Sequence, residues 1–150
     1  MRKIGFIGCG HMAKALIKGL KSNKSYEILG HDRNQTNIVW LEHEKITFCT
    51  LKEICQKSDI LMICVKPKDM YDLCSEMQSY VGKEVKIVSV AAGITLENLQ
   101  TALSTGKIYR AMPNIGARHN LGITSIFSFE EKDEVLDIFN YLGKALVVED

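Results

Sequence analysis

A glycine-rich hexapeptide near the N-terminus is the clearest place in the sequence for ligand chemistry. It follows an apolar run at Lys3–Ile7 and precedes apolar residues at helical spacing. In such a strand-turn-helix unit, Gly8 permits the tight turn, Gly10 leaves space for a pyrophosphate, and Ala13 lets the helix lie close to the sheet. The helix N-terminus offers free N–H groups and a partial positive charge to phosphates. The pattern predicts a dinucleotide held by Gly8, Cys9, Gly10, His11 and Met12.

Two charged residues follow the second apolar run, about 20 positions after the glycines. Asp32 could accept hydrogen bonds from the adenosine ribose hydroxyls of NAD, and a carboxylate there would repel a 2′-phosphate. Arg33 could instead pair with the 2′-phosphate of NADP, lie over the adenine ring, or be a solvated loop residue. The two neighbours therefore leave NADP and NAD both open as the cofactor.

Short β-rich runs alternate with helical patterns along most of the chain. Ile60–Val65 is continuously apolar, which is typical of a central parallel strand buried on both faces. Other strands are expected at Lys3–Ile7, Glu27–His31, Ile46–Phe48, Val85–Val90 and Lys107–Ala111, and helices at Met12–Leu20, Gln35–His43, Leu51–Gln56, Lys68–Met77 and Thr95–Leu103. This alternation predicts an α/β fold: a Rossmann-like, doubly wound, mostly parallel sheet with helices on both faces.

The last part of the chain breaks this rhythm. Strands are expected at Gly122–Phe127 and Ala145–Val148, separated by an amphipathic helix at Glu131–Tyr141. We therefore expect about two extra strands at the C-terminal end of the sheet, within one domain that spans residues 1–150.

Composition narrows the class of protein. The chain has 150 residues, of which 46% are hydrophobic and 25% charged, with 19 basic and 18 acidic side chains. A disordered chain would be less hydrophobic and more highly charged. Nucleic-acid and membrane-surface proteins usually carry a basic excess, so neither kind of partner is expected. Without a membrane span or an export signal, we expect a cytoplasmic protein with a small-molecule ligand.

The cysteines and histidines indicate no metal site. The five cysteines contain no C-x-x-C pair and are expected to be reduced, mostly in the core. The four histidines, His11, His31, His43 and His119, show no ligand-like spacing. Cys9 leaves two alternatives open: a reactive thiol whose pKa is lowered by the helix N-terminus, or a small residue tolerated between two glycines.

Four segments, in order, resemble the N-terminal domain of Δ1-pyrroline-5-carboxylate reductases. They are Ile4–Ala13, Asp59 leading to Val65-Lys66-Pro67, Val88–Thr95 with its Ala-Ala-Gly-Ile-Thr, and Arg110–Asn114 with its Met-Pro-Asn. The resemblance implies that the cofactor is lined by Val65, Lys66 and Pro67 and by Ala91, Ala92 and Gly93. Asn114 could orient the carboxamide, the substrate carboxylate or only its own turn.

The resemblance also implies a reaction, the last step of proline biosynthesis. A hydride passes from the reduced nicotinamide to the C=N carbon of pyrroline-5-carboxylate and gives L-proline. No catalytic proton donor is predicted among these residues. Two alternatives stay open: a stand-alone nucleotide-binding or regulatory protein without catalysis, and another small oxidoreductase of the β-hydroxyacid-dehydrogenase type.

The chain departs from the family pattern in three places. The family usually continues Thr-Pro-Ala after Asn114, whereas this chain reads Ile115 to Asn120 without that motif. Leu51 stands where the family commonly has an asparagine near the cofactor ribose. The chain ends where the family's helical C-terminal domain, which forms its homo-oligomer and binds the substrate carboxylate, would begin. We therefore expect this chain alone to be weakly active or inactive.

Overall fold

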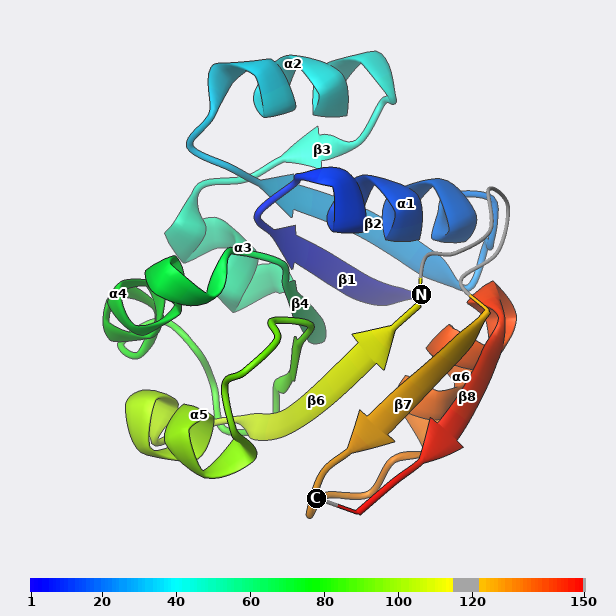
Figure 1. Ribbon diagram of the computed structural model, residues 1–150. Helices are drawn as coiled ribbons and strands as arrows, with labels where there is room; N and C mark the ends of the chain where they lie inside the picture. Colours follow the sequence, from blue (N-terminus) through cyan, green and yellow to red (C-terminus); the bar gives the residue numbers. More distant parts are fainter. Residues whose placement is uncertain (115–121, 150) are drawn as a thin grey trace.

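The computed structural model describes residues 1–114 and 122–149, which build one eight-stranded sheet. Its strand order is β3-β2-β1-β4-β5-β6-β7-β8 (Figure 1). The strands are β1 (Arg2–Ile7), β2 (Tyr26–His31), β3 (Thr47–Phe48), β4 (Ile60–Ile63), β5 (Lys86–Ser89), β6 (Lys107–Pro113), β7 (Ile123–Phe127) and β8 (Lys144–Val147). The helices are α1 (His11–Leu20), α2 (Gln35–His43), α3 (Leu51–Lys57), η1 (Pro67–Asp69), α4 (Met70–Met77), α5 (Leu96–Leu103) and α6 (Asp133–Leu142).

The predicted fold class is confirmed. Strands β1 to β6 pair with one another in parallel. Strand β7 then pairs with β6 in the antiparallel direction, and β8 pairs with β7 in parallel. The direction changes where the alternation of strand and helix stops in the sequence. The order also reverses between β1 and β4, where the chain leaves one half of the sheet and starts the other. In doubly wound sheets, ligands bind at this switch point, outside the carboxyl ends of the strands.

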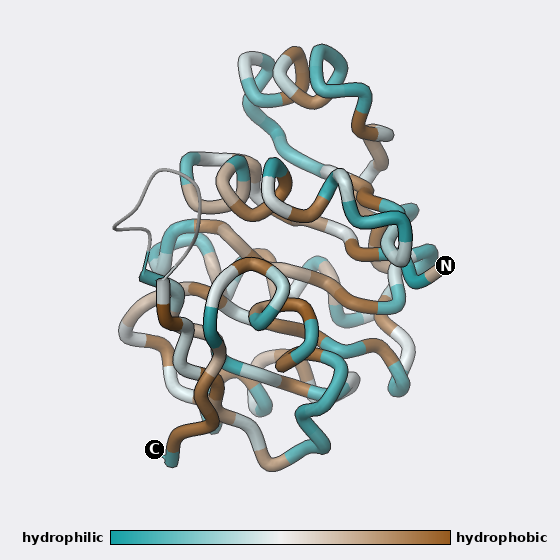
Figure 2. The backbone as a smooth tube through the Cα atoms, turned by 90° about the vertical axis from the view of Figure 1, so that its right-hand side faces the viewer, coloured by the Kyte–Doolittle hydropathy of each residue, from teal (hydrophilic) through white to brown (hydrophobic). Residues whose placement is uncertain are grey.

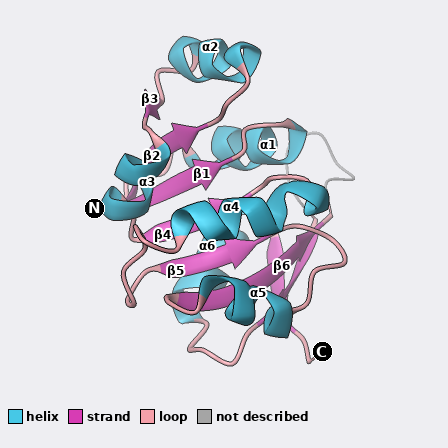
Figure 3. Ribbon diagram, turned by 90° about the vertical axis from the view of Figure 1, so that its left-hand side faces the viewer, coloured by secondary structure: helices cyan, strands magenta, loops and turns pink. Residues whose placement is uncertain are grey.

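Helices cover both faces of the sheet, as predicted. Helices α3, α4 and α5 lie on one face, with α1 and α6 on the other (Figure 3). In β4 the side chains alternate between the two cores: Ile60 and Met62 pack on the α1 and α6 side, and Leu61 and Ile63 on the other. All four are buried, which explains why this run carries no polar residue. Each such side chain contributes about 1.5–3 kcal/mol when fully buried.

Several element boundaries differ from the predictions by one or two residues, among them the ends of β4 and β6. Strand β4 ends at Ile63, two residues earlier than expected, although the Cys64 N–H still donates to the Ile7 carbonyl at 2.8 Å. Pro67 then begins the short 3₁₀ turn η1, because its fixed φ suits the first position of a helix. Strand β6 instead continues two residues beyond the prediction, to Pro113.

Apolar residues fill the interior and also reach the surface at one end. Figure 2 shows hydrophobic segments through the middle of the molecule and along the stretch that leads to the C-terminus. There Leu146 and Val147 are exposed in β8. Within the described ranges, no helix has the length and apolar character that a membrane crossing requires.

Candidate functional site

Gly8 is required by the geometry of the first turn. Its φ is +86°, a left-handed conformation that L side chains rarely adopt. A Cβ atom at Gly8 would lie 3.0 Å from the carbonyl carbon and oxygen of Cys64 and from Cγ1 of Val65. The Gly8 N–H meanwhile donates to the His31 carbonyl at 2.9 Å. The first turn therefore lies wedged between the ends of β2 and β4.

Gly10 and the start of α1 leave a set of backbone donors open. A Cβ atom at Gly10 would have no neighbour within 4 Å, so the space above this residue is free. The first helical hydrogen bond runs from the Lys14 N–H to the Gly10 carbonyl, and within the described residues the N–H groups at positions 10–13 have no acceptor. The first turn of α1 contains no acidic residue. This end of the helix can therefore hold phosphate groups.

Asp32 closes the glycine loop from the end of β2. Its Oδ2 accepts the Cys9 N–H at 2.7 Å and the Asn37 side-chain amide at 2.9 Å, and its Oδ1 accepts the Asn34 N–H at 2.8 Å. The sequence predicted only a contact with a ribose. The structure adds that the Asp32 carboxylate holds the loop in place. Its two oxygens can still accept a hydrogen bond from one further donor.

These hydrogen bonds explain the ionisation of Asp32. Its pKa lies below the ordinary value. Partial burial would by itself raise the pKa, but the N–H groups of Asn34 and Cys9 and the amide of Asn37 favour the charged form and outweigh it. Asp32 is therefore a carboxylate at neutral pH.

A polar chain extends from Asp32 to α1. The Lys14 ammonium donates to Oδ1 of Asn37 at 2.9 Å and lies 5.5 Å from the ring centre of Trp40. Asn34 caps α2 by accepting the Thr36 N–H at 2.8 Å. The first turn of α2 is thus joined both to α1 and to the glycine loop, which makes the loop part of a rigid scaffold.

A cavity of about 350 Å³ opens beside this loop. It is lined by Ile7, Gly8, His31, Asp32, Arg33, Val65, Asp69, Asp72 and Leu73. Arg33 is 73% exposed, and its Nη2 lies 2.5 Å from Oε2 of Glu76 in α4. The hydrogen bond and charge of Glu76, together with nearby Asp69 and Asp72, raise the pKa of Arg33. Of the alternatives left open for Arg33, the structure shows an exposed residue, here paired with the carboxylate of Glu76 in α4.

The acidic residues beside this cavity were missed in the sequence: Asp69 and Asp72 line it, and Glu76 pairs with Arg33 next to it. Asp69, Asp72 and Glu76 come from η1 and α4, directly after the turn that follows β4. A signal was present, because positions 69, 72 and 76 follow the i, i+3, i+7 spacing of one helical face. The predicted helix at Lys68–Met77 follows a strand beside the switch point, so the face that carries positions 69, 72 and 76 could have been assigned to the site.

The remaining predicted cofactor residues lie at the same edge of the sheet. Val65 reaches the cavity directly. Lys66 and Pro67 are exposed after β4, Ala91 is buried after β5, and Ala92 and Gly93 are exposed beside it. Asn114 is exposed at the end of β6, while Ile115 to Asn120 lie outside the described residues. The cavity joins only Val65 to Gly8 and Asp32, so contacts of the others with a cofactor stay a prediction.

Cys9 is a packing residue. Its side chain is fully buried, and burial, together with the charge of Asp32, raises its pKa to about 12. The alternative of a thiol activated by the helix N-terminus is therefore wrong, because burial outweighs the helix dipole. All five cysteines are free thiols. Within residues 1–114 and 122–149, no three His, Cys, Asp or Glu side chains are placed to share a metal ion, and His119 lies outside these ranges.

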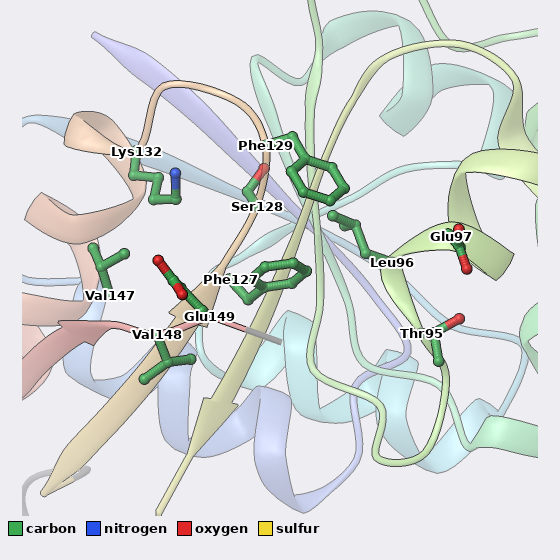
Figure 4. Close-up of a pocket in the computed structure, with 10 residues that line it drawn as sticks. All are labelled: Thr95, Leu96, Glu97, Phe127, Ser128, Phe129, Lys132, Val147, Val148 and Glu149. Carbon is green, nitrogen blue, oxygen red and sulfur yellow. The ribbon is translucent and has the colours of Figure 1, made fainter.

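A second cavity, of about 550 Å³, lies beside β7 and β8, at one end of the strand order (Figure 4). Its walls come from the start of α5, from β7 and the turn after it, and from the chain around β8. Half of the lining residues are apolar, and Phe127 and Phe129 contact each other edge to face at 5.4 Å between ring centres. The residues are Thr95, Leu96, Glu97, Phe127, Ser128, Phe129, Lys132, Val147, Val148 and Glu149.

Comparison with known proteins places this geometry among oxidoreductases. The chain is 36% identical over 159 aligned residues to the pyrroline-5-carboxylate reductase of Escherichia coli, covering 98% of this chain and 59% of that protein. The structure of a pyrroline-5-carboxylate reductase from Coxiella burnetii superposes with a TM-score of 0.88 at 25% identity, covering 98% of this chain and 58% of that one. The enzyme from Plasmodium falciparum, solved with NADP bound, shares the fold at a TM-score of 0.77 and 22% identity, over 99% of this chain and 58% of that one.

These matches confirm the resemblance seen in the four sequence segments. The chain spans somewhat less than three fifths of the length of these relatives. A family model described as "NADP oxidoreductase coenzyme F420-dependent" matches residues 3–93, which include the glycine loop, Asp32 and the turn after β4. By that match the chain belongs to this NADP oxidoreductase family.

Proposed function

We propose that residues 1–150 form the dinucleotide-binding domain of an NAD(P)H-dependent reductase that converts Δ1-pyrroline-5-carboxylate to L-proline. The observation that carries the proposal is the loop at the switch point, where open N–H groups, a free space over Gly10 and a carboxylate at Asp32 meet. Similarity to pyrroline-5-carboxylate reductases along 98% of the chain supports the substrate. Five free thiols support a reducing compartment such as the cytoplasm.

The residues of the chain would bind and orient the cofactor. The N–H groups at the start of α1 would hold the pyrophosphate, and Asp32 would accept a ribose hydroxyl while it keeps the loop closed. When bound, the reduced nicotinamide supplies the hydride for the C=N bond. Val65, Lys66, Pro67, Ala91, Ala92, Gly93 and Asn114 would line the nicotinamide end, because they follow β4, β5 and β6 at the same edge.

The substrate side of the reaction rests on the relatives. Their remaining two fifths of chain would supply further contacts with the substrate and the surface for assembly into a homo-oligomer. We infer that the domain described here contributes cofactor binding and little turnover by itself. No proton donor is assigned among these residues.

The first experiment is a fluorescence titration of the chain with NADH and with NADPH. Binding of at least one nucleotide below millimolar is expected, and absence of binding by both would refute the proposal. Oxidation of the nucleotide in the presence of pyrroline-5-carboxylate should then be slow with this chain and rapid with the complete product of its gene. A complete product that binds nucleotide without turnover would favour a stand-alone nucleotide-binding protein. Turnover only with a hydroxy acid would favour a dehydrogenase.

A further inference from the structure

The ion pair between Arg33, which lines the cavity at the end of β2, and Glu76 of α4 lies beside that cavity. Arg33 directly follows Asp32, whereas Glu76 lies 43 residues later, in the last turn of α4. The Nη2 and Oε2 atoms are 2.5 Å apart. Both side chains are well exposed, at 73% and 45%, so the pair is free to reorganise when a ligand enters. The pair therefore competes directly with any anion that would use Arg33.

The other charges around this cavity are negative. Asp32, Asp69 and Asp72 line it, and Glu76 adds a fourth carboxylate beside the one guanidinium of Arg33. Lys66 and Lys68 belong to the neighbouring turn, but neither lines the cavity. A group with two negative charges would thus approach an excess of like charge, which is unfavourable by Coulomb's law.

We propose that Glu76 is a specificity-determining residue: it holds Arg33 away from an adenosine 2′-phosphate, so that the chain favours the dinucleotide whose ribose carries a free 2′-hydroxyl. This inference rests on the proposed function, since it concerns the same cofactor. A 2′-phosphate could pair with Arg33 only by breaking the contact with Glu76 and by lying near Asp32, Asp69 and Asp72. A 2′-hydroxyl meets no such repulsion and can donate a hydrogen bond to Asp32.

The sequence could not distinguish these outcomes, because Asp32 and Arg33 are adjacent and point to different cofactors. The structure separates them by their partners. The Arg33 guanidinium is held by a carboxylate of another element, whereas the carboxylate of Asp32 faces the cavity with its loop contacts satisfied. Glu76 therefore decides which of the two neighbours acts on the nucleotide.

The test compares nucleotide affinities in the Glu76→Gln variant. Replacing the carboxylate with an amide removes its charge and frees Arg33, so the dissociation constant for NADPH should fall by about three- to tenfold at low ionic strength. The dissociation constant for NADH should stay within about twofold. Asp137→Asn is the matched control, because it makes the same chemical change on the exposed side of α6, across the sheet. It should alter neither affinity.

A second variant keeps the inference falsifiable. Adding Arg33→Gln to Glu76→Gln should abolish the gain in NADPH affinity, since the freed guanidinium is its source. Thermal unfolding of each variant checks that the fold is retained. If Glu76→Gln binds both nucleotides with an unchanged ratio, the inference is overturned while the proposed function stands. If the unaltered chain binds neither nucleotide, both fall; if it binds NADPH more tightly than NADH, the preference proposed here is wrong.

Discussion

The two cavities of this protein differ in chemistry more than in size. The cavity at the switch point is the smaller, at about 350 Å³, yet a glycine loop, three aspartates and an arginine border it. The cavity beside β7 and β8 holds about 550 Å³, and five of its ten lining residues are phenylalanine, leucine or valine. The candidate site is therefore distinguished by polar groups whose hydrogen bonds fix their position and by open backbone donors, and not by its volume.

The two regions also differ in how they are held. At the switch point, Asp32, Asn37 and Lys14 connect three elements by charged or polar hydrogen bonds. Beside β7, the buried Ser128 hydroxyl donates to the Ile108 carbonyl at 2.6 Å and accepts the Glu130 N–H at 3.0 Å. We expect substitutions in the first region to change nucleotide affinity and stability together, and substitutions in the second to change stability alone.

The largest effect is expected for Gly8→Ala. The new Cβ would be placed in a left-handed conformation and against the backbone of Cys64. Strain and overpacking together should lower the free energy of unfolding by about 2–4 kcal/mol. Gly93→Ala is the control for strain without a close contact, since its φ is +78° and a Cβ there would have no neighbour within 4 Å. Urea unfolding should show a clearly smaller loss for Gly93→Ala, and equal losses would contradict the packing argument.

The second-largest effect is expected for Asp32→Ala. It leaves the partly buried Cys9 N–H without its acceptor, which should cost about 1–3 kcal/mol and weaken both NADH and NADPH, because the loop itself is loosened. A role confined to cofactor choice would instead leave stability unchanged and shift only the ratio of affinities. Urea unfolding and nucleotide titration of the same sample decide between the two.

The lowered pKa of Asp32 predicts a pH dependence at the acid end. A carboxyl group whose native pKa is depressed contributes stability above its unfolded pKa, and this contribution is lost as the pH falls through the native pKa. The ordinary value is 3.8, so the loss begins near that pH and continues below it. In Asp32→Asn the free energy of unfolding should fall less steeply below pH 3.8 than in the unaltered chain. An identical slope would show that the loop hydrogen bonds do not stabilise the ionised form.

Ser128→Ala tests the other region. It removes one hydroxyl that serves both as donor and as acceptor beside the larger cavity. We expect a loss of about 1 kcal/mol in the free energy of unfolding and no change in the affinity for either nucleotide. A change in nucleotide affinity comparable with that of Asp32→Ala would break the distinction between the two cavities.

The smallest effect is expected for Phe129→Ala. This side chain is 72% exposed at the rim of the larger cavity, so its truncation should change the free energy of unfolding by less than about 0.5 kcal/mol. Nucleotide affinity should be unaltered. Thermal unfolding with and without NADH measures both quantities. Loss of the nucleotide-dependent stabilisation would indicate that the nucleotide binds at the larger cavity and not at the switch point.

Much of the fold was accessible from the sequence because local patterns agree with the tertiary structure. The helix predicted at Gln35–His43 is observed with those bounds, and the helix predicted at Thr95–Leu103 is observed as α5, with Thr95 as its N-cap. Boundaries failed beside the site, at Ile63 and Pro113, where strand pairing and the proline turn compete with apolar periodicity. Periodicity places Glu76 on one helical face with Asp69 and Asp72, but its pairing with Arg33 depends on the distance between α4 and the end of β2, which periodicity does not encode.

The order of strands and helices, the glycine loop and the acidic residue after β2 can be read from the sequence, because they follow from local spacing and from the backbone freedom that only glycine has at Gly8. The tertiary structure alone decided the antiparallel entry of β7, the closure of the loop by Asp32 and the pairing of Arg33 with Glu76. These three features have in common that the interacting residues lie far apart in the sequence. Each of these depends on hydrogen bonds or charges between residues that are distant in the chain and become neighbours only when the sheet is assembled.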